Sequence, residues 1–219
     1  MFRMNENLKA LVFDMDGVLI DSESVCDVIW ERLADEMGLP DIQAAIAENR
    51  GCNEELMAKN LTARYGADFD CPKFFNDFRV YFHQVEFSQG IPLLPYVAET
   101  LDYLKGRGYR LALATSTRRS TATRQLKAVG IFDIFEAWTF GDEIEHSKPA
   151  PDIYLKAARE LGVEPKFCAG VEDSPNGIRS VRAAGFKAIM VPDRIEPSEE
   201  IKALCWKVVK PILELKEFL

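Results

Sequence analysis

The sequence predicts an α/β protein in which a doubly wound parallel sheet carries an inserted domain of four helices. Three observations lead to this fold class. A short apolar run at residues 10–13, of the kind a buried parallel strand shows, leads directly into two aspartates. Residues 22–90 show helical periodicity without a strand signal, whereas residues 91–219 alternate between strand and helix signals. The predicted domains are therefore residues 1–21 with 91–219, and residues 22–90.

The first predicted strand leads into Asp14, Asp16 and Gly17. Residues i and i+2 of a strand face the same side, so the two carboxylates should leave the strand end together. Gly17 lets the chain turn away directly after them. Two carboxylates this close repel each other unless a cation lies between them or they share a proton. This strand end is therefore a candidate site for chemistry.

The insert at residues 22–90 is predicted to contain four short helices. The first has apolar residues at every fourth position: Val25, Ile29, Leu33 and Met37. The second is expected to begin near residue 41, and the third near Asn53. The fourth opens at Pro72, which suits a first helical turn. Its apolar stripe predicts the core of a small bundle and consists of Phe74, Phe75, Phe78, Phe82 and Val85.

Beyond a linker at residues 88–92, strand and helix signals alternate. Strands are predicted at residues 109–114, 137–140, 167–171, 188–191 and 206–209. Helices are predicted at residues 96–105, 120–129, 152–161 and 175–184, with a final helix opened by Pro211. This alternation is typical of a Rossmann-like parallel sheet covered by helices on both faces. Open α/β sheets bind ligands at the carboxyl ends of their strands, so we expect the insert to form a cap that closes over that edge.

Composition and charge argue against several classes of function. The 219 residues are 47% hydrophobic and carry a net charge of −8, which disfavours a nucleic acid or an anionic membrane as partner. The five cysteines form no CxxC pair, which favours reduced thiols over disulfides or a zinc site. The sequence has no apolar run long enough to cross a bilayer, and its first residues lack a signal-peptide pattern. We expect a cytoplasmic protein that is a monomer or weak homo-oligomer.

Polar residues also follow the later predicted strands. Thr115 and Ser116 lie at a strand end just before a helix, where hydroxyls and free amides suit a phosphate oxygen. A helix N-cap would explain only one hydroxyl of this Thr-Ser-Thr run. Lys148, held within Lys-Pro-Ala-Pro, is a candidate anion ligand at the same sheet edge. Glu172 and Asp173 are either a helix cap with its neighbour or half of a hard-cation site.

In this order, these strand ends resemble the four motifs of the haloacid dehalogenase (HAD) superfamily: Asp-x-Asp-Gly, a Thr/Ser, Lys-Pro-x-Pro and Glu-Asp-Ser. The resemblance covers nearly the whole chain, including a helical cap between the first and second motifs. It is greatest to the β-phosphoglucomutase-like branch, which contains both mutases and small-molecule phosphatases. It implies a Mg²⁺-dependent enzyme that acts on a small phosphorylated metabolite, such as a sugar or polyol phosphate.

The resemblance also implies a role for each motif residue. Asp14 would be the nucleophile that carries an aspartyl-phosphate, and Asp16 would be the general acid and base. Mg²⁺ would be held by the Asp14 carboxylate, the Asp16 backbone carbonyl and Asp173, with Glu172 close by or bound through water. The phosphoryl oxygens would be held by Thr115, the Ser116 amide and Lys148.

The predicted cap departs from β-phosphoglucomutases at positions that concern the substrate. Cys26 occupies the place of their cap histidine, and Glu54 falls where they carry an arginine. A mutase must bind a second phosphate, and a glutamate opposes this, so we favour hydrolysis. Arg50 is expected to touch the substrate on closure. Arg118 and Arg119 are either contacts for a distal anionic group or solvated residues at a helix start. Whether Cys26 or Cys52 lines the pocket stays open.

Three hypotheses result from these patterns. The first is a phosphatase, and the second is a phosphomutase of the β-phosphoglucomutase type. The third is a non-catalytic phosphate-sensing module, because receiver-like modules also use Asp, Ser/Thr and Lys on a parallel sheet. Receivers are shorter, place the phosphorylated aspartate on a middle strand and lack a helical insert, so turnover of a substrate would separate this hypothesis from the other two.

Overall fold

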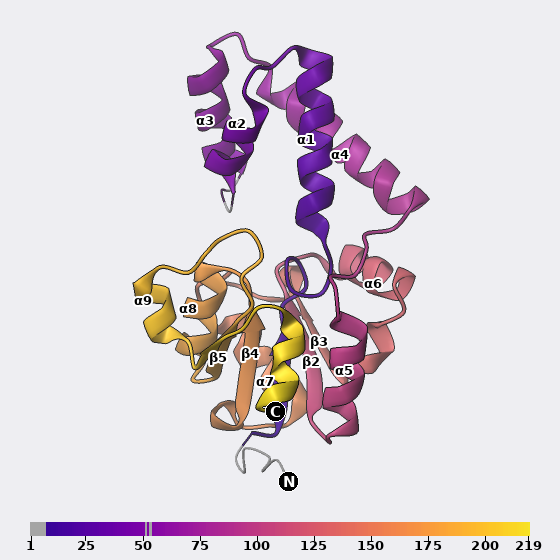
Figure 1. Ribbon diagram of the computed structural model, residues 1–219, viewed down its shortest axis with the longest axis vertical. Helices are drawn as coiled ribbons and strands as arrows, with labels where there is room; N and C mark the ends of the chain where they lie inside the picture. Colours follow the sequence, from indigo (N-terminus) through magenta and orange to yellow (C-terminus); the bar gives the residue numbers. More distant parts are fainter. Residues whose placement is uncertain (1–7, 51, 53) are drawn as a thin grey trace. The chain divides into compact units, whose positions relative to one another are not determined.

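The computed structural model describes residues 8–50, 52 and 54–219. In it the chain folds into two units, one built on a sheet and the other made of helices (Figure 1). The first unit comprises Met1–Asp21 and Pro92–Leu219, and the second comprises Ser22–Ile91. The second unit therefore ends at Ile91, one residue later than the predicted end of the insert at residue 90. No helix among the described residues is long and apolar enough to span a membrane.

A parallel sheet of six strands organises the first unit, in the order β3-β2-β1-β4-β5-β6. The strands are β1 (Ala10–Phe13), β2 (Arg110–Thr115), β3 (Ala137–Phe140), β4 (Cys168–Glu172), β5 (Lys187–Met190) and β6 (Lys207–Val208). The chain extends the sheet from β1 through β2 to β3 and then returns to add β4 on the other side of β1. The strand order therefore reverses between β1 and β4, and ligands bind at such a switch point in open α/β sheets.

Helices follow the strands of this unit. The α-helices are α5 (Val97–Gly106), α6 (Arg119–Ala128), α7 (Asp152–Leu161), α8 (Pro175–Ala183) and α9 (Glu199–Leu204). The 3-10 helices are η1 (Phe132–Ile134), η2 (Gly141–Glu143), η3 (Pro165–Phe167) and η4 (Ile212–Glu217). Residues of α7 and α8 pack with Ala10 and Val12 of β1, and the alternate residues Leu11 and Phe13 are also fully buried. Both faces of the central strand are therefore covered, as its uninterrupted apolar sequence predicts.

The second unit is a helical bundle built from α1 (Ser22–Met37), α2 (Ile42–Asn49), α3 (Glu54–Tyr65) and α4 (Cys71–Ser88). The Asp70 side chain caps α4 by accepting a hydrogen bond from the Lys73 amide. Trp30 and Phe74 meet edge to face at the centre of the bundle core, with 5.0 Å between their ring centroids. Of the predicted stripe, Phe74 and Phe75 are buried, whereas Phe78 and Phe82 are only partly buried against this core.

Two features near the carboxyl terminus differ from the sequence-based expectation. The segment after Pro211 is the 3-10 helix η4 and not an α-helix, and its buried Ile212 and Leu215 have the three-residue spacing of that helix. Helix α9 was not predicted, because a helix of six residues carries too little periodicity to be recognised.

In the helical unit, the expected start of the third helix, Asn53, lies outside the described residues.

Candidate active site

Three acidic side chains meet where β1 and β4 end. Asp14 follows β1, Glu172 is the last residue of β4, and Asp173 comes next. The register pairs Phe13 with Val171, and the Asp14 amide continues the ladder by donating to the Val171 carbonyl at 2.9 Å. One carboxylate oxygen from each acid lies within 4.8 Å of the other two. The switch point of the sheet therefore brings together acids that lie far apart in the sequence.

Lys148 enters this acidic cluster from the loop between β3 and α7. Its Nζ lies 2.8 Å from Asp14 Oδ1 and 2.7 Å from Glu172 Oε1, and it donates to the Ala114 carbonyl at 3.3 Å. These contacts hold the ammonium group between the ends of β1, β2 and β4. The structure thus places Lys148 beside the predicted nucleophile.

Glu172 is fully buried and has three side-chain partners. Besides Lys148, the Tyr154 hydroxyl donates to Oε1 at 2.5 Å, and the Ser174 hydroxyl donates to Oε2 at 3.3 Å. Ser174 also caps α8 by accepting from the Gly177 amide at 3.0 Å. Glu172 is therefore held rigidly and in turn holds Lys148. Tyr154 was not predicted as a site residue, because nothing in its helical sequence context distinguishes it from an ordinary core tyrosine.

Burial and mutual repulsion shift the pKa values in the cluster. Burial, together with the charge of Glu172, raises the pKa of Asp14 to about 7, although Lys148 opposes this shift. Burial, followed by Glu172 and Asp14, raises the pKa of Asp173 to about 9. Burial alone would lower the pKa of Lys148, but Asp14 and Glu172 outweigh it and raise that pKa above its ordinary value. The lysine is therefore charged at neutral pH, while Asp14 and Asp173 hold their protons more tightly than an aspartate in water.

The donor set of the cluster fits a hard divalent cation. Asp14, Glu172 and Asp173 offer three carboxylate oxygens that lie within 4.8 Å of one another, and carboxylate oxygens are the ligands that hard divalent cations prefer. Gly17 has a positive φ of 70° and approaches Asp173 so closely that a Cβ at this position would lie 2.5 Å from Asp173 Oδ2. The backbone after β1 is thus packed directly against the Asp173 carboxylate.

The end of β2 forms a second part of the site. The buried Thr115 hydroxyl accepts a hydrogen bond from the Thr117 amide at 3.0 Å, and a hydroxyl that accepts keeps its own proton to donate. Ser116 is exposed. The Thr117 hydroxyl donates to Asp16 Oδ2 at 2.8 Å and so ties the loop after β2 to the loop after β1. Thr117 was not proposed from the sequence, although it completes the Thr-Ser-Thr run that drew attention to this strand end.

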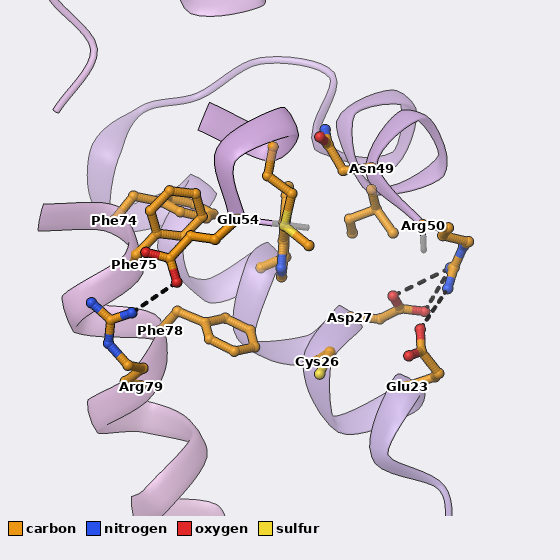
Figure 2. Close-up of a pocket in the computed structure, with 13 residues that line it drawn as sticks. Glu23, Cys26, Asp27, Asn49, Arg50, Glu54, Phe74, Phe75, Phe78 and Arg79 are labelled. Carbon is orange, nitrogen blue, oxygen red and sulfur yellow. Dashed lines mark hydrogen bonds and ion pairs between the residues drawn. The ribbon is translucent and has the colours of Figure 1, made fainter. Parts of the chain in front are cut away.

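The predicted substrate-binding arginines belong to different units of the structure. Arg118 is exposed at the N-cap position of α6 and makes no side-chain capping bond. Arg50, at the end of α2 in the helical unit, pairs with Asp27 at 2.9 Å and with Glu23 at 3.4 Å (Figure 2). Gly51, the residue after Arg50, lies outside the described residues.

Arg50 lines a pocket of about 330 Å³ within the helical unit. Phe74, Phe75 and Phe78 form an aromatic wall of this pocket, and Cys26 also lines it (Figure 2). Glu54 pairs with Arg79 of α4 at 3.1 Å, on the opposite side of the pocket from Arg50. Each of the two arginines in the pocket lining therefore has a carboxylate partner, whereas Cys52 is not among the lining residues.

The parallel sheet and the acidic cluster with its buried lysine at the carboxyl edge define an α/β enzyme that handles a phosphate ester. A family model for haloacid dehalogenase-like hydrolases matches residues 8–185. The chain therefore belongs to the haloacid dehalogenase-like hydrolases.

Named relatives include both phosphatases and a mutase. The chain is 33% identical over 213 residues to Protein CbbY of Rhodobacter capsulatus, covering 92% of each chain. It is 33% identical over 191 residues to fructose-1-phosphate phosphatase YqaB of Escherichia coli, covering 86% of this chain and 98% of that one. It is 30% identical over 193 residues to beta-phosphoglucomutase of Bacillus subtilis, covering 84% of this chain and 83% of that one.

A solved structure shares the same fold. The HAD family hydrolase of Deinococcus radiodurans, which was crystallised with bound phosphate and sodium, superposes with a TM-score of 0.81 at 25% identity. The match covers 95% of this chain and 93% of that one. The fold predicted from the sequence, with its parallel sheet and helices, is therefore confirmed, as is the resemblance to the β-phosphoglucomutase-like branch.

Proposed function

We propose that this enzyme is a Mg²⁺-dependent phosphatase that hydrolyses a small phosphorylated metabolite, a sugar or polyol phosphate, through an aspartyl-phosphate. The observation that carries the proposal is the acidic cluster with Lys148 at one sheet edge. Oxygens of Asp14, Glu172 and Asp173 lie within 4.8 Å of one another, and the buried ammonium group of Lys148 contacts the first two of these acids. A dianionic phosphoryl group needs positive charge here, and Lys148 with a divalent cation would supply it.

The residues of the cluster would act in two steps. An Asp14 oxygen attacks phosphorus, the ester P–O bond breaks, and the leaving alkoxide takes a proton from Asp16. Water then attacks the phosphorus of the aspartyl-phosphate while Asp16 takes the proton of that water, and Asp14 is released with inorganic phosphate. The hydrogen bond from Thr117 to Asp16 Oδ2 would orient the acid for both transfers. Bound Mg²⁺, held by Asp14, Asp173 and the Asp16 carbonyl with Glu172 nearby, would neutralise charge on the phosphoryl oxygens.

Phosphoryl oxygens would be bound by Thr115, the Ser116 amide and Lys148. The Thr115 hydroxyl is buried at the end of β2 and is oriented by the Thr117 amide. Lys148 is tethered to Glu172 and Asp14, so its charge is positioned before the substrate arrives. Positioning of this kind lowers the cost of reorganisation during the reaction.

We further propose that the helical unit is a cap domain whose pocket receives the organic part of the substrate, with Arg50 among the contacts and Arg118 as a further contact from α6. Arg50 and Arg79 in this pocket face three carboxylates, those of Glu23, Asp27 and Glu54. A pocket with this balance has no surplus positive charge for a second phosphate, which supports hydrolysis of monophosphates over a mutase reaction. Fructose-1-phosphate phosphatase of Escherichia coli, a relative, acts on a substrate with one phosphate.

A phosphomutase is the second candidate function, because beta-phosphoglucomutase of Bacillus subtilis is a relative of similar identity.

We also propose a cytoplasmic location, since none of the five cysteines, all of which the structure describes, forms a disulfide. The proposed partners are a small phosphorylated metabolite and Mg²⁺, with no nucleic acid or membrane.

The test is phosphate release from a panel of phosphorylated sugars and polyols with Mg²⁺, for the wild type and for Asp14→Asn. We expect turnover by the wild type and its abolition in the variant. Full activity of Asp14→Asn would contradict the mechanism. Conversion of β-glucose 1-phosphate to the 6-phosphate faster than phosphate release would favour the mutase. Absence of both reactions would favour a binding module.

A further inference from the structure

The loop that follows β2 is supported by the 3-10 turn η2, which lies directly after β3. Thr115, the last residue of β2, pairs in the ladder with Phe140, the last residue of β3. The two strands therefore end together, and the segments that leave them, Ser116–Thr117 and Gly141–Glu143, begin side by side. The amide of Gly141 donates to the Thr117 carbonyl at 3.1 Å.

Gly141 also allows a backbone approach that no other residue would allow. A Cβ at this position would overlap the backbone carbonyl of Ser116. The φ of Gly141 is not positive, so the close approach and not the backbone conformation requires glycine here. The carbonyl side of Ser116 therefore rests directly on the turn.

Asp142 caps the helix that follows the loop. Its Oδ1 accepts a hydrogen bond from the amide of Arg119, the first residue of α6, at 3.0 Å. The residue at the N-cap position, Arg118, has no side chain that can accept such a bond, so a carboxylate from a different segment replaces the usual local cap. A negative charge at this place also suits the positive end of the helix dipole.

Glu143 adds a side-chain link to the same helix start. It accepts from Arg119 Nε at 2.7 Å and from Lys156 Nζ of α7 at 2.6 Å. The Arg119 guanidinium also lies over the Phe140 ring, 4.6 Å from its centroid. Three consecutive residues of η2 thus hold the backbone and a side chain of the segment from Ser116 to Arg119.

We propose that Gly141–Glu143 is a positioning element of the active site, in which Asp142 fixes the start of α6 and thereby the Ser116 amide and the Thr117 hydroxyl. Thr117 transmits this placement to Asp16 through its 2.8 Å hydrogen bond. None of the three residues is itself proposed to bind the metal or the phosphoryl group, so their role is one of positioning. The inference rests on the proposed phosphatase function, since it assigns Ser116 and Asp16 their roles in that reaction.

The test compares Asp142→Ala with Asp142→Asn, because asparagine keeps the oxygen that accepts from Arg119. We expect Asp142→Ala to lower kcat by about 10- to 100-fold with a smaller change in KM, since misplacement of catalytic groups by about 1 Å has effects of this size. Asp142→Asn should stay within about threefold of the wild type, because Asn and Asp cap helices equally well. Asp133→Ala, which removes an exposed aspartate from the neighbouring turn η1, is the matched control.

Hydrogen exchange of the Arg119 amide provides a readout that does not depend on turnover. It should be faster by about tenfold or more in Asp142→Ala, as expected for loss of a capping bond, and remain protected in Asp142→Asn. Wild-type kcat in a folded Asp142→Ala variant, or equal losses in the Ala and Asn variants, would overturn the proposal. A wild type without any phosphatase activity would refute the proposed function instead, and unchanged Arg119 exchange in Asp142→Ala would then still refute the positioning role.

Discussion

The ammonium nitrogen of Lys148 lies 2.8 Å from Asp14 Oδ1, in an ion pair whose side chains are only 9% and 13% exposed. A pair this well shielded from water interacts more strongly than a surface salt bridge. It also places a cation next to the carboxylate proposed to attack phosphorus. Lys148 therefore has two roles that can be separated by experiment: it stabilises the folded acids, and it would bind the transferred phosphoryl group.

Replacing Lys148 by Met should impair both roles. We expect kcat/KM for phosphate release to fall by at least about 100-fold, because a preorganised positive charge at the phosphoryl group is lost. The free energy of unfolding of the metal-free protein at alkaline pH should fall by about 3–5 kcal/mol, since the remaining acids stay buried without their cation. Lys59→Met, which removes an exposed partner of Glu55, should change stability by less than about 1 kcal/mol. Equal stability of both variants in chemical denaturation would contradict this account.

Stability without metal should decrease as pH rises. An unfolded aspartate releases its proton near 3.8, whereas the pKa is about 7 for folded Asp14 and about 9 for folded Asp173. Between these values the folded state binds more protons than the unfolded state, so the free energy of unfolding falls with increasing pH. Divalent metal binds the ionised acids, and the increase in Tm caused by Mg²⁺ should therefore be larger at about pH 9 than at about pH 6.

Thermal unfolding in Mg²⁺ and in EDTA at both pH values measures this effect. Asp173→Asn removes the acid with the higher pKa, so its Tm in EDTA should depend less on pH than that of the wild type. The same Mg²⁺-induced increase in Tm at both pH values would show that the buried acids are not the metal ligands.

Gly177 tests how closely Glu172 is packed. In an ordinary helix, alanine in place of glycine adds about 0.5–1 kcal/mol of stability. At Gly177, however, the new Cβ would overlap the Glu172 carboxylate, which binds Lys148 and Tyr154. We therefore expect Gly177→Ala to lower both Tm and kcat. Gly106→Ala in α5, where the new Cβ meets nothing within 4 Å, should instead raise Tm without affecting activity. A stabilised, fully active Gly177→Ala enzyme would show that Glu172 has room to move.

Removing the hydroxyl of Thr117 should affect catalysis more than binding. Thr117→Val keeps the size and branching of the side chain but loses the donor to Asp16 Oδ2. We expect kcat to fall by about 10- to 100-fold, the range associated with imperfect placement of an acid–base group. Thr117→Ser, which retains the donor, should recover most of this loss. If the Val and Ser variants have the same kcat, the hydrogen bond to Asp16 is not used in the reaction.

Much of the first unit could be predicted from the sequence because its central strands are buried on both faces. The predicted bounds of β1, β3 and α7 coincide with the observed Ala10–Phe13, Ala137–Phe140 and Asp152–Leu161. The first is a continuous apolar run, the second is a short segment rich in aromatic residues, and the third is a strongly periodic helix limited by turn residues. The order of the strands in the sheet could not be predicted in this way, because β4 pairs with β1 through residues more than 150 positions apart. No local pattern shows which strands become neighbours.

The candidate site also has a part that could be predicted from the sequence and a part that could not. Asp14, Lys148, Glu172 and Asp173 could be proposed together, because each lies at or after the carboxyl end of a strand in one parallel sheet, and such ends share an edge. The hydrogen bond from Thr117 to Asp16 and the one from Tyr154 to Glu172 could not, since each depends on side-chain directions set by tertiary packing. For Arg50 the sequence indicated a substrate contact, whereas its ion pairs with Asp27 and Glu23 became visible only in the structure.

The charge balance of the pocket in the helical unit leads to a prediction about specificity. Glu54 neutralises Arg79 at 3.1 Å, in a pair whose side chains are 64% and 55% exposed. Glu54→Gln keeps the size of the side chain but leaves Arg79 without this carboxylate. If the pocket receives the organic part of the substrate, kcat/KM for a hexose bisphosphate relative to a hexose monophosphate should rise by about fivefold, the size of an exposed ionic contact. The gain should shrink with added salt, because exposed charges are screened. Glu55→Gln, next along α3 and paired with Lys59, is the matched control and should leave the ratio unchanged. A ratio that stays constant in Glu54→Gln, or that changes equally in Glu55→Gln, would mean that this pocket does not select the substrate by charge.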